Sequence, residues 1–239
     1  MQPWRMIDSV MTPEGLLELR RRGQRSFLIT IAGRVLMTSD AHRSEDALAE
    51  LACAPLAGRA RPRLLLGGLG MGYTLRAALD ALPGPAHVTV ADLNPIVVGW
   101  CRGPLAALTA RAVDDPRVTV VVRDVAAVIA AAPAASLDAI VLDLYEGPHE
   151  ARNRESSSLY GAAALERARR VLVAGGVLAV WSEEPDPPFE GRMAAAGFEV
   201  ERHRRGRGGR AHIIYTGLRR ASPPGGQRPR PRRSRPVSG

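Results

Sequence analysis

The feature that most constrains the fold of this chain is a regular alternation of short apolar runs with helical segments, from Arg63 to about Gly217. The apolar runs are rich in Leu, Val and Ile, and helix-favouring segments follow them. Strands that alternate with helices of about ten residues form a parallel sheet covered on both faces. We therefore expect a doubly wound α/β fold with a mostly parallel sheet, whose predicted strands are 63–68, 87–92, 117–122, 137–143 and 176–181.

Further segments flank this alternating region. Residues 27–38 hold two β-prone runs around Ala32-Gly33, which predicts a β-hairpin in a small N-terminal element, 1–60, with a helix starting near Ser44. Two runs within 198–217 predict a closing antiparallel hairpin, so the main domain is 61–218. Residues 219–239 are Arg, Pro, Gly and Ser with almost nothing apolar, which predicts a disordered tail.

The net charge of +9 is concentrated in that tail, which holds seven arginines and no acid and leaves the rest of the chain with +2. Contact of the tail with nucleic acid is conceivable, but a solvated tail is favoured because no aromatic residues are interleaved for base stacking. No apolar run approaches the roughly 20 residues that span a bilayer. The N-terminus lacks a secretory-signal pattern, so we expect a cytoplasmic protein without a membrane partner.

The first predicted strand runs directly into a glycine cluster, with Gly68, Gly70 and Gly72 before a predicted helix at 73–82. Glycines let the backbone turn tightly and let a ligand approach the N-terminus of the helix. A dinucleotide fingerprint would need a further glycine where Tyr73 stands, and a Walker loop would need Lys followed by Ser or Thr. The cluster therefore favours neither of these, and a turn without a ligand stays open.

Carboxylates follow the second and third predicted strands. Asp92 comes 20 residues after Gly72, where a carboxylate usually accepts both hydroxyls of a ribose. Asp124 either accepts a hydrogen bond from an adenine amino group or only caps the next helix. Because the carboxyl ends of parallel strands share one crevice, these acids and the glycine cluster together predict a nucleoside site.

Two more carboxylates, Asp143 and Glu146, follow the fourth predicted strand. They suit recognition of a cationic amine, and one of them, partly desolvated, could serve as a general base. The alternative is that Asp143 only ends the strand and Glu146 is solvated. Tyr160 could line the substrate pocket, although packing at a helix start is the favoured interpretation. The histidines are scattered without ligand spacing, so we expect no metal.

With these residues laid out, the chain resembles the polyamine aminopropyltransferase (spermidine synthase) family, which shares its core with class I S-adenosylmethionine-dependent methyltransferases. The resemblance covers about Phe27 to Gly217, and its more specific parts are DDPRV (114–118) and the two acids after the fourth strand. It implies a Rossmann-like methyltransferase fold. It also implies transfer of an aminopropyl group from decarboxylated S-adenosylmethionine to putrescine or a similar small amine.

The resemblance also implies roles for the site residues. The glycine loop would bind the donor nucleoside, Asp92 would hold the ribose, and Asp124 would lie near the adenine. Asp143 matches the catalytic acid that orients and deprotonates the attacking amine. Glu146 takes the place of the second acid of the family, which binds the far end of the amine.

The chain departs from the family at one position of the glycine loop. The family usually has GGGDGG, whose Asp binds the amino group of the donor. In this chain Gly70 occupies the position of that Asp. A carboxylate at that position would repel the carboxylate of S-adenosylmethionine itself. Its loss leaves open a methyltransferase that uses S-adenosylmethionine, and a non-catalytic nucleoside-binding relative is a further alternative. A homodimer is also left open.

Overall fold

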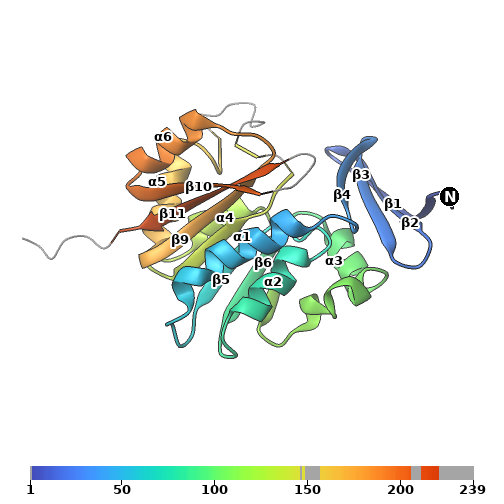
Figure 1. Cartoon of the computed structure of the whole chain (residues 1–239), viewed down its shortest axis with the longest axis horizontal. Helices are drawn as coiled ribbons and strands as arrows, with labels where there is room; N and C mark the ends of the chain where they lie inside the picture. Colours follow the sequence, from blue (N-terminus) through green and yellow to red (C-terminus); the bar gives the residue numbers. More distant parts are fainter. Residues whose placement is uncertain (1, 146, 149–156, 206–210, 221–239) are drawn as a thin grey trace, which may run out of the picture.

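The larger of two β-sheets contains the strands of the predicted alternation of strands and helices. The computed structural model describes residues 2–145, 147–148, 157–205 and 211–220. Seven strands pair in the order β10-β11-β9-β8-β5-β6-β7 (Figure 1). They are β5 (Arg63–Gly67), β6 (His87–Asp92), β7 (Val118–Val122), β8 (Leu137–Leu142), β9 (Leu172–Ser182), β10 (Phe198–Arg205) and β11 (His212–Arg219). The strands β5 to β9 pair in parallel, and β11 joins β9 and β10 antiparallel, so the predicted doubly wound fold with its closing hairpin is confirmed.

Helices cover both faces of this sheet. They are α1 (Arg43–Cys53), α2 (Tyr73–Ala81), α3 (Pro95–Arg102), α4 (Val125–Ala131), α5 (Ala162–Val171) and α6 (Pro187–Ala195). Successive side chains of a strand point to opposite faces. Accordingly, Leu64 and Leu66 pack in a core with α1, α2 and α3, whereas Leu65 packs in a second core with α4, α5 and α6. Burial on both faces explains why β5 reads as a continuous apolar run.

The N-terminal element is larger than the predicted hairpin. The hairpin at 27–38 is present as β3 (Ser26–Ile31) and β4 (Arg34–Thr38), and it extends into a four-stranded antiparallel sheet with β1 (Arg5–Thr12) and β2 (Gly15–Arg22). The two additional strands were not predicted, because β1 is almost entirely exposed and β2 ends in three arginines. Neither strand therefore shows the alternation that signals a strand in a sequence.

The N-terminal sheet shares the core of the main domain. Leu17, Leu19, Phe27 and Ile29 belong to the same buried cluster as the residues of α1 and α2. In Figure 1 this sheet lies beside the ends of the parallel strands rather than apart from them. It is therefore placed to contribute side chains to a site at the carboxyl ends of the strands.

The C-terminal boundary differs slightly from the prediction. Arg219, assigned to the tail from the sequence, pairs with Phe198 in the last register position of β10 and β11, and its guanidinium donates to the Leu172 carbonyl. A backbone carbonyl binds the Arg219 guanidinium at the end of β11. The sequence shows only that this residue is charged, so it was grouped with the other arginines of the tail. Residues 221–239 of the predicted tail lie outside the described residues. Within the described part, no helix has the length and apolar character to cross a membrane.

Asp138 ties the start of β8 to the segment before β5, and its replacement with asparagine is expected to destabilise the fold. The carboxylate is 5% exposed and accepts hydrogen bonds from Arg59 Nη1 and from the Arg63 backbone N–H, each at 2.8 Å. Losing a hydrogen-bonded charge there costs about 1.5–3 kcal/mol in the free energy of unfolding. The measurement is urea unfolding.

The matched control for this prediction is Asp80→Asn. Asp80 pairs with Arg76 on the exposed side of α2, and its side chain is 67% exposed. Such a surface pair contributes about 0.5 kcal/mol or less. Equal unfolding midpoints for the two variants would show that Asp138 does not anchor β8.

Candidate active site

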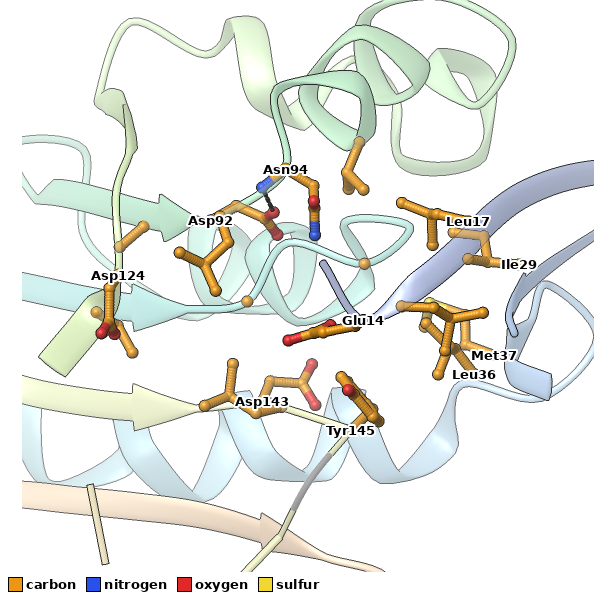
Figure 2. Close-up of a pocket in the computed structure, with 18 of the residues that line it drawn as sticks. Glu14, Leu17, Ile29, Leu36, Met37, Asp92, Asn94, Asp124, Asp143 and Tyr145 are labelled. Carbon is orange, nitrogen blue, oxygen red and sulfur yellow. Dashed lines mark hydrogen bonds between the residues drawn. The ribbon is translucent and has the colours of Figure 1, made fainter. Parts of the chain in front are cut away.

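A pocket of about 240 Å³ lies where the loops after β5, β6, β7 and β8 meet the N-terminal sheet (Figure 2). The connections of the sheet reverse direction between β5 and β8. The strands β6 and β7 lie on one side of β5, whereas β8 and β9 lie on its other side. Open α/β sheets bind ligands at such a switch point, outside the carboxyl ends of the strands. The pocket therefore lies where the sequence predicted a site.

The glycine loop takes a backbone shape that side chains rarely allow. Gly68, Gly70 and Gly72 have φ angles of +88°, +52° and +86°. A Cβ on Gly68 would lie 2.1 Å from the carbonyl oxygen of Asp143. Gly68 and Gly70 line the pocket, whereas Gly72 is the N-cap of α2 and is not among its lining residues. The first two glycines thus open the pocket, and the third turns the chain into the helix.

Met37 from β4 occupies the space beside Gly70. Its sulfur lies 2.9 Å from the position that a Cβ on Gly70 would take. The Met71 backbone N–H donates to the same sulfur at 3.1 Å. Met37 therefore fills the space that a side chain at Gly70 would enter. The sequence alone does not indicate this contact.

Asp92 links the second strand of the site to the glycine loop. One carboxylate oxygen accepts the Leu69 backbone N–H, and the other accepts the Asn94 backbone N–H, both at 2.8 Å. Burial raises the pKa of this carboxyl, although the two backbone bonds oppose the shift. A carboxylate has about four lone-pair directions, so Asp92 can hold the loop and still accept hydrogen bonds from a ligand in the pocket.

Asp124 has the capping role that the sequence left open. Its Oδ1 accepts the Ala126 backbone N–H at 2.8 Å, which makes it the N-cap of α4. The residue also lines the pocket. Capping does not use every lone pair, so contact with an adenine amino group stays a prediction.

Asp143 is the most strongly perturbed acid of the pocket. It follows β8 directly, and the Thr74 hydroxyl donates to its Oδ2 at 2.5 Å. Burial, together with the negative charge of Glu45, raises the pKa of Asp143 to about 7. Figure 2 shows its carboxylate directed toward the same space as those of Asp92 and Glu14. A carboxylate in this state is suited to take a proton near neutral pH.

Two acids of the pocket were missed by the sequence analysis. Glu14 lies in the turn between β1 and β2, and Glu45 lies in the first turn of α1. The described lining contains five carboxylates and one guanidinium, which are Glu14, Glu45, Asp92, Asp124, Asp143 and Arg123. The pocket therefore attracts cations and repels anions. No local pattern marks Glu14, because the strands beside it carry no clear alternation.

Tyr160, one of the two predicted substrate-binding residues, is not among the residues that line the pocket. Tyr160 is 3% exposed and packs edge-on against Phe189 at 5.8 Å between ring centroids, which agrees with the packing interpretation rather than with pocket lining. Its neighbour Leu159 lines the pocket instead. Glu146 lies outside the described residues. Among the residues that the structure does describe, no group of three His, Cys, Asp or Glu side chains could hold a metal ion.

Comparison with known proteins supports the resemblance seen in the sequence. No protein-family model matches the chain. The chain is 32% identical over 167 residues to the polyamine aminopropyltransferases of Mycobacterium tuberculosis and Mycobacterium bovis. The match covers 69% of this chain but 30% of each relative, so the chain spans less than a third of their length.

Solved structures agree with the fold. The spermidine synthase from Thermotoga maritima has a TM-score of 0.72 at 16% identity, over 90% of this chain and 73% of that chain. A spermidine synthase in complex with the transition-state analogue AdoDATO has a TM-score of 0.71 at 17% identity, over 90% and 72%. A probable spermidine synthase from Corynebacterium glutamicum has 0.55 at 19% identity, over 91% and 81%. The chain is thus similar in sequence to polyamine aminopropyltransferases and has the fold of spermidine synthases.

Proposed function

We propose, from this similarity and from the geometry of the pocket, that the protein is an aminopropyltransferase. It would move an aminopropyl group from decarboxylated S-adenosylmethionine to an amine such as putrescine. The observation that carries the proposal is the convergence of Asp92, Asp143 and the glycine loop on one pocket whose charged lining residues are five carboxylates and one arginine. The donor is a sulfonium with an ammonium group and the acceptor is an ammonium, so both match the charge of the lining.

The donor nucleoside fits the half of the pocket formed by β5, β6 and β7. Gly68 leaves the backbone open to the ligand, and Asp92 would accept the ribose hydroxyls. Ala91 and Val125 offer apolar contacts for the adenine, and Asp124 would accept its amino group. The sulfonium end would then point toward Asp143, which lies after the neighbouring strand β8.

The reaction needs a base, because an alkylammonium has no free electron pair. The ammonium gives a proton to Asp143, and the neutral nitrogen attacks the carbon next to the sulfonium. The C–S bond breaks, and its electrons stay on sulfur, which leaves as a neutral thioether. Holding nitrogen, carbon and sulfur in line supplies much of the remaining acceleration.

The test is analysis of the products by mass spectrometry. The protein is incubated with decarboxylated S-adenosylmethionine and a panel of diamines, and in parallel with S-adenosylmethionine. An aminopropylated amine supports the proposal. A methylated product, formed only from S-adenosylmethionine, would assign the protein to the methyltransferases instead. Absence of any product with either donor would overturn the proposal in favour of a binding protein.

The pH dependence of transfer follows from the state of Asp143. Only the ionised carboxylate accepts a proton, and its pKa is raised to about 7. We therefore expect kcat/KM at a saturating donor concentration to fall as the pH decreases through about 7. The pH profile measures this directly. If kcat/KM stays constant from about pH 7 down to the ordinary pKa of an aspartate, Asp143 is not the base.

A further inference from the structure

A chain of hydrogen bonds leads from the last strand of the sheet to the pocket wall. Nδ1 of His212, in β11, lies 3.0 Å from the Ser44 hydroxyl oxygen. The Ser44 hydroxyl donates to Oε2 of Glu45 at 2.6 Å. Because its proton is used on Glu45, Ser44 accepts from His212, and the imidazole therefore carries a proton on Nδ1. The chain runs from His212 through Ser44 to Glu45.

This chain of hydrogen bonds is partly buried, with Ser44 as its buried member. Ser44 is 8% exposed although it lies in the first turn of α1, and its side chain does not cap that helix, whose N-cap is His42. The His212 ring lies 5.0 Å from the ring of Trp181, which itself lines the pocket. A buried hydroxyl fixed between an imidazole and a carboxylate restricts the direction of that carboxylate.

Glu45 in turn acts on Asp143. Both line the pocket, and the negative charge of Glu45 is one of the causes that raise the pKa of Asp143. Thr74 from α2 donates to Asp143. The other titratable groups that face the pocket are Glu14 before β2, Asp92 at the end of β6, Arg123 and Asp124 after β7, and Tyr145. Among these groups, the charge of Glu45 is the one that acts on the pKa of Asp143.

We propose that Ser44 and His212 are positioning residues that hold the Glu45 carboxylate toward Asp143, so that the two carboxylates act as a pair on the attacking amine. The inference rests on the proposed function. Asp143 takes one proton from the alkylammonium, and Glu45 accepts a hydrogen bond from a remaining N–H. When the new C–N bond forms and the C–S bond breaks, the product is a secondary ammonium whose positive charge Glu45 faces. Asp143 then releases its proton to solvent.

The experiment combines three variants with two readouts. Glu45→Gln keeps the shape of the side chain and removes its charge, whereas Ser44→Ala and His212→Leu break the chain that holds it. We expect each to lower kcat/KM for the acceptor by about tenfold or more. We also expect the acidic limb of the pH profile to move to lower pH, because the negative charge of Glu45 is removed in the first variant and is no longer held toward Asp143 in the other two. His212→Asn keeps an N–H donor near the place of Nδ1 and should restore most of the activity.

The control is His87→Leu, at the exposed start of β6 and thus at the opposite end of the sheet from the pocket. It should leave both readouts unchanged, and unfolding midpoints check that each variant is folded. If His212→Leu and Ser44→Ala keep the wild-type rate and pH profile, the inference is overturned. An unchanged profile would show that the two residues have at most a structural role.

A titration of Asp143 by carboxyl ¹³C NMR separates this inference from the proposed function, because it needs no turnover. The Asp143 resonance is assigned by its loss in Asp143→Asn. A lower pKa of Asp143 in Glu45→Gln, Ser44→Ala and His212→Leu supports the positioning, even if the wild-type protein yields no product and the proposed function fails. An unchanged pKa in all three overturns the positioning, even if the wild-type protein transfers the aminopropyl group.

Discussion

Replacing Asp143 with asparagine is expected to lower kcat/KM for transfer by about 10²- to 10⁴-fold. Asparagine has nearly the same shape and can still accept the hydroxyl of Thr74, but it cannot take a proton from the amine. In the proposed binding mode, Asp92 and the glycine loop hold the nucleoside, so the affinity for the donor should stay close to that of the wild type. The measurements are steady-state kinetics and calorimetric titration of the nucleoside.

Asp80→Asn is the control for this variant, since it alters an exposed carboxylate of α2. It should change neither the rate nor the affinity. If Asp143→Asn lost nucleoside affinity together with activity, Asp143 would be a donor-binding residue rather than the base.

The same variant has a second consequence, for stability. The pKa of Asp143 is raised in the folded protein from 3.8 to about 7, so between these values the folded chain binds more protons than the unfolded chain. Stability contributed by this carboxyl is therefore lost as the pH rises through that window. Asp143→Asn should raise the melting temperature at a pH above the window, and the gain should disappear below it.

Replacing Gly68 with alanine is expected to damage both the fold and the site. The residue has a φ of +88°, and the new Cβ would lie 2.1 Å from the Asp143 carbonyl oxygen, which is backbone and cannot swing away. Strain at such a position costs about 1–3 kcal/mol even without a clash, so we expect a loss of about 3 kcal/mol or more in the free energy of unfolding. Because β5 and β8 would have to separate there, nucleoside affinity should fall by at least about tenfold.

Gly99→Ala is the matched control for this substitution. Gly99 lies inside α3, and a Cβ there would meet no atom within 4 Å. Alanine in a helix is favoured over glycine by about 0.5–1 kcal/mol, so this variant should be neutral or slightly more stable. Thermal unfolding and calorimetry compare the two variants. Similar values for both would mean that the glycine loop does not shape the pocket.

The fold could be predicted from the sequence because its signal is local. Each parallel strand reads as a short apolar run, and Asn94-Pro95 marks the start of α3. The N-terminal sheet was underestimated because β1 has almost no buried face of its own. A strand that is recognisable only through its partner gives no periodic pattern.

The site was predictable only in part, for a related reason. Asp92, Asp124 and Asp143 follow strands whose carboxyl ends must converge, so topology brings them to one pocket. Glu14 and Glu45 reach the same pocket from the N-terminal sheet and α1, and the contact of Ser44 with His212 joins residues 168 positions apart. No spacing rule connects such residues.

The central claim is that a pocket whose charged lining residues are mostly carboxylates binds a sulfonium nucleoside whose side chain ends in an ammonium group. The most direct test is calorimetric titration of the wild-type protein with decarboxylated S-adenosylmethionine and with S-adenosylmethionine. The account predicts tighter binding of the decarboxylated donor, because the carboxylate of the other would face Glu14, Asp92 and Asp143. Equal or tighter binding of S-adenosylmethionine would contradict it.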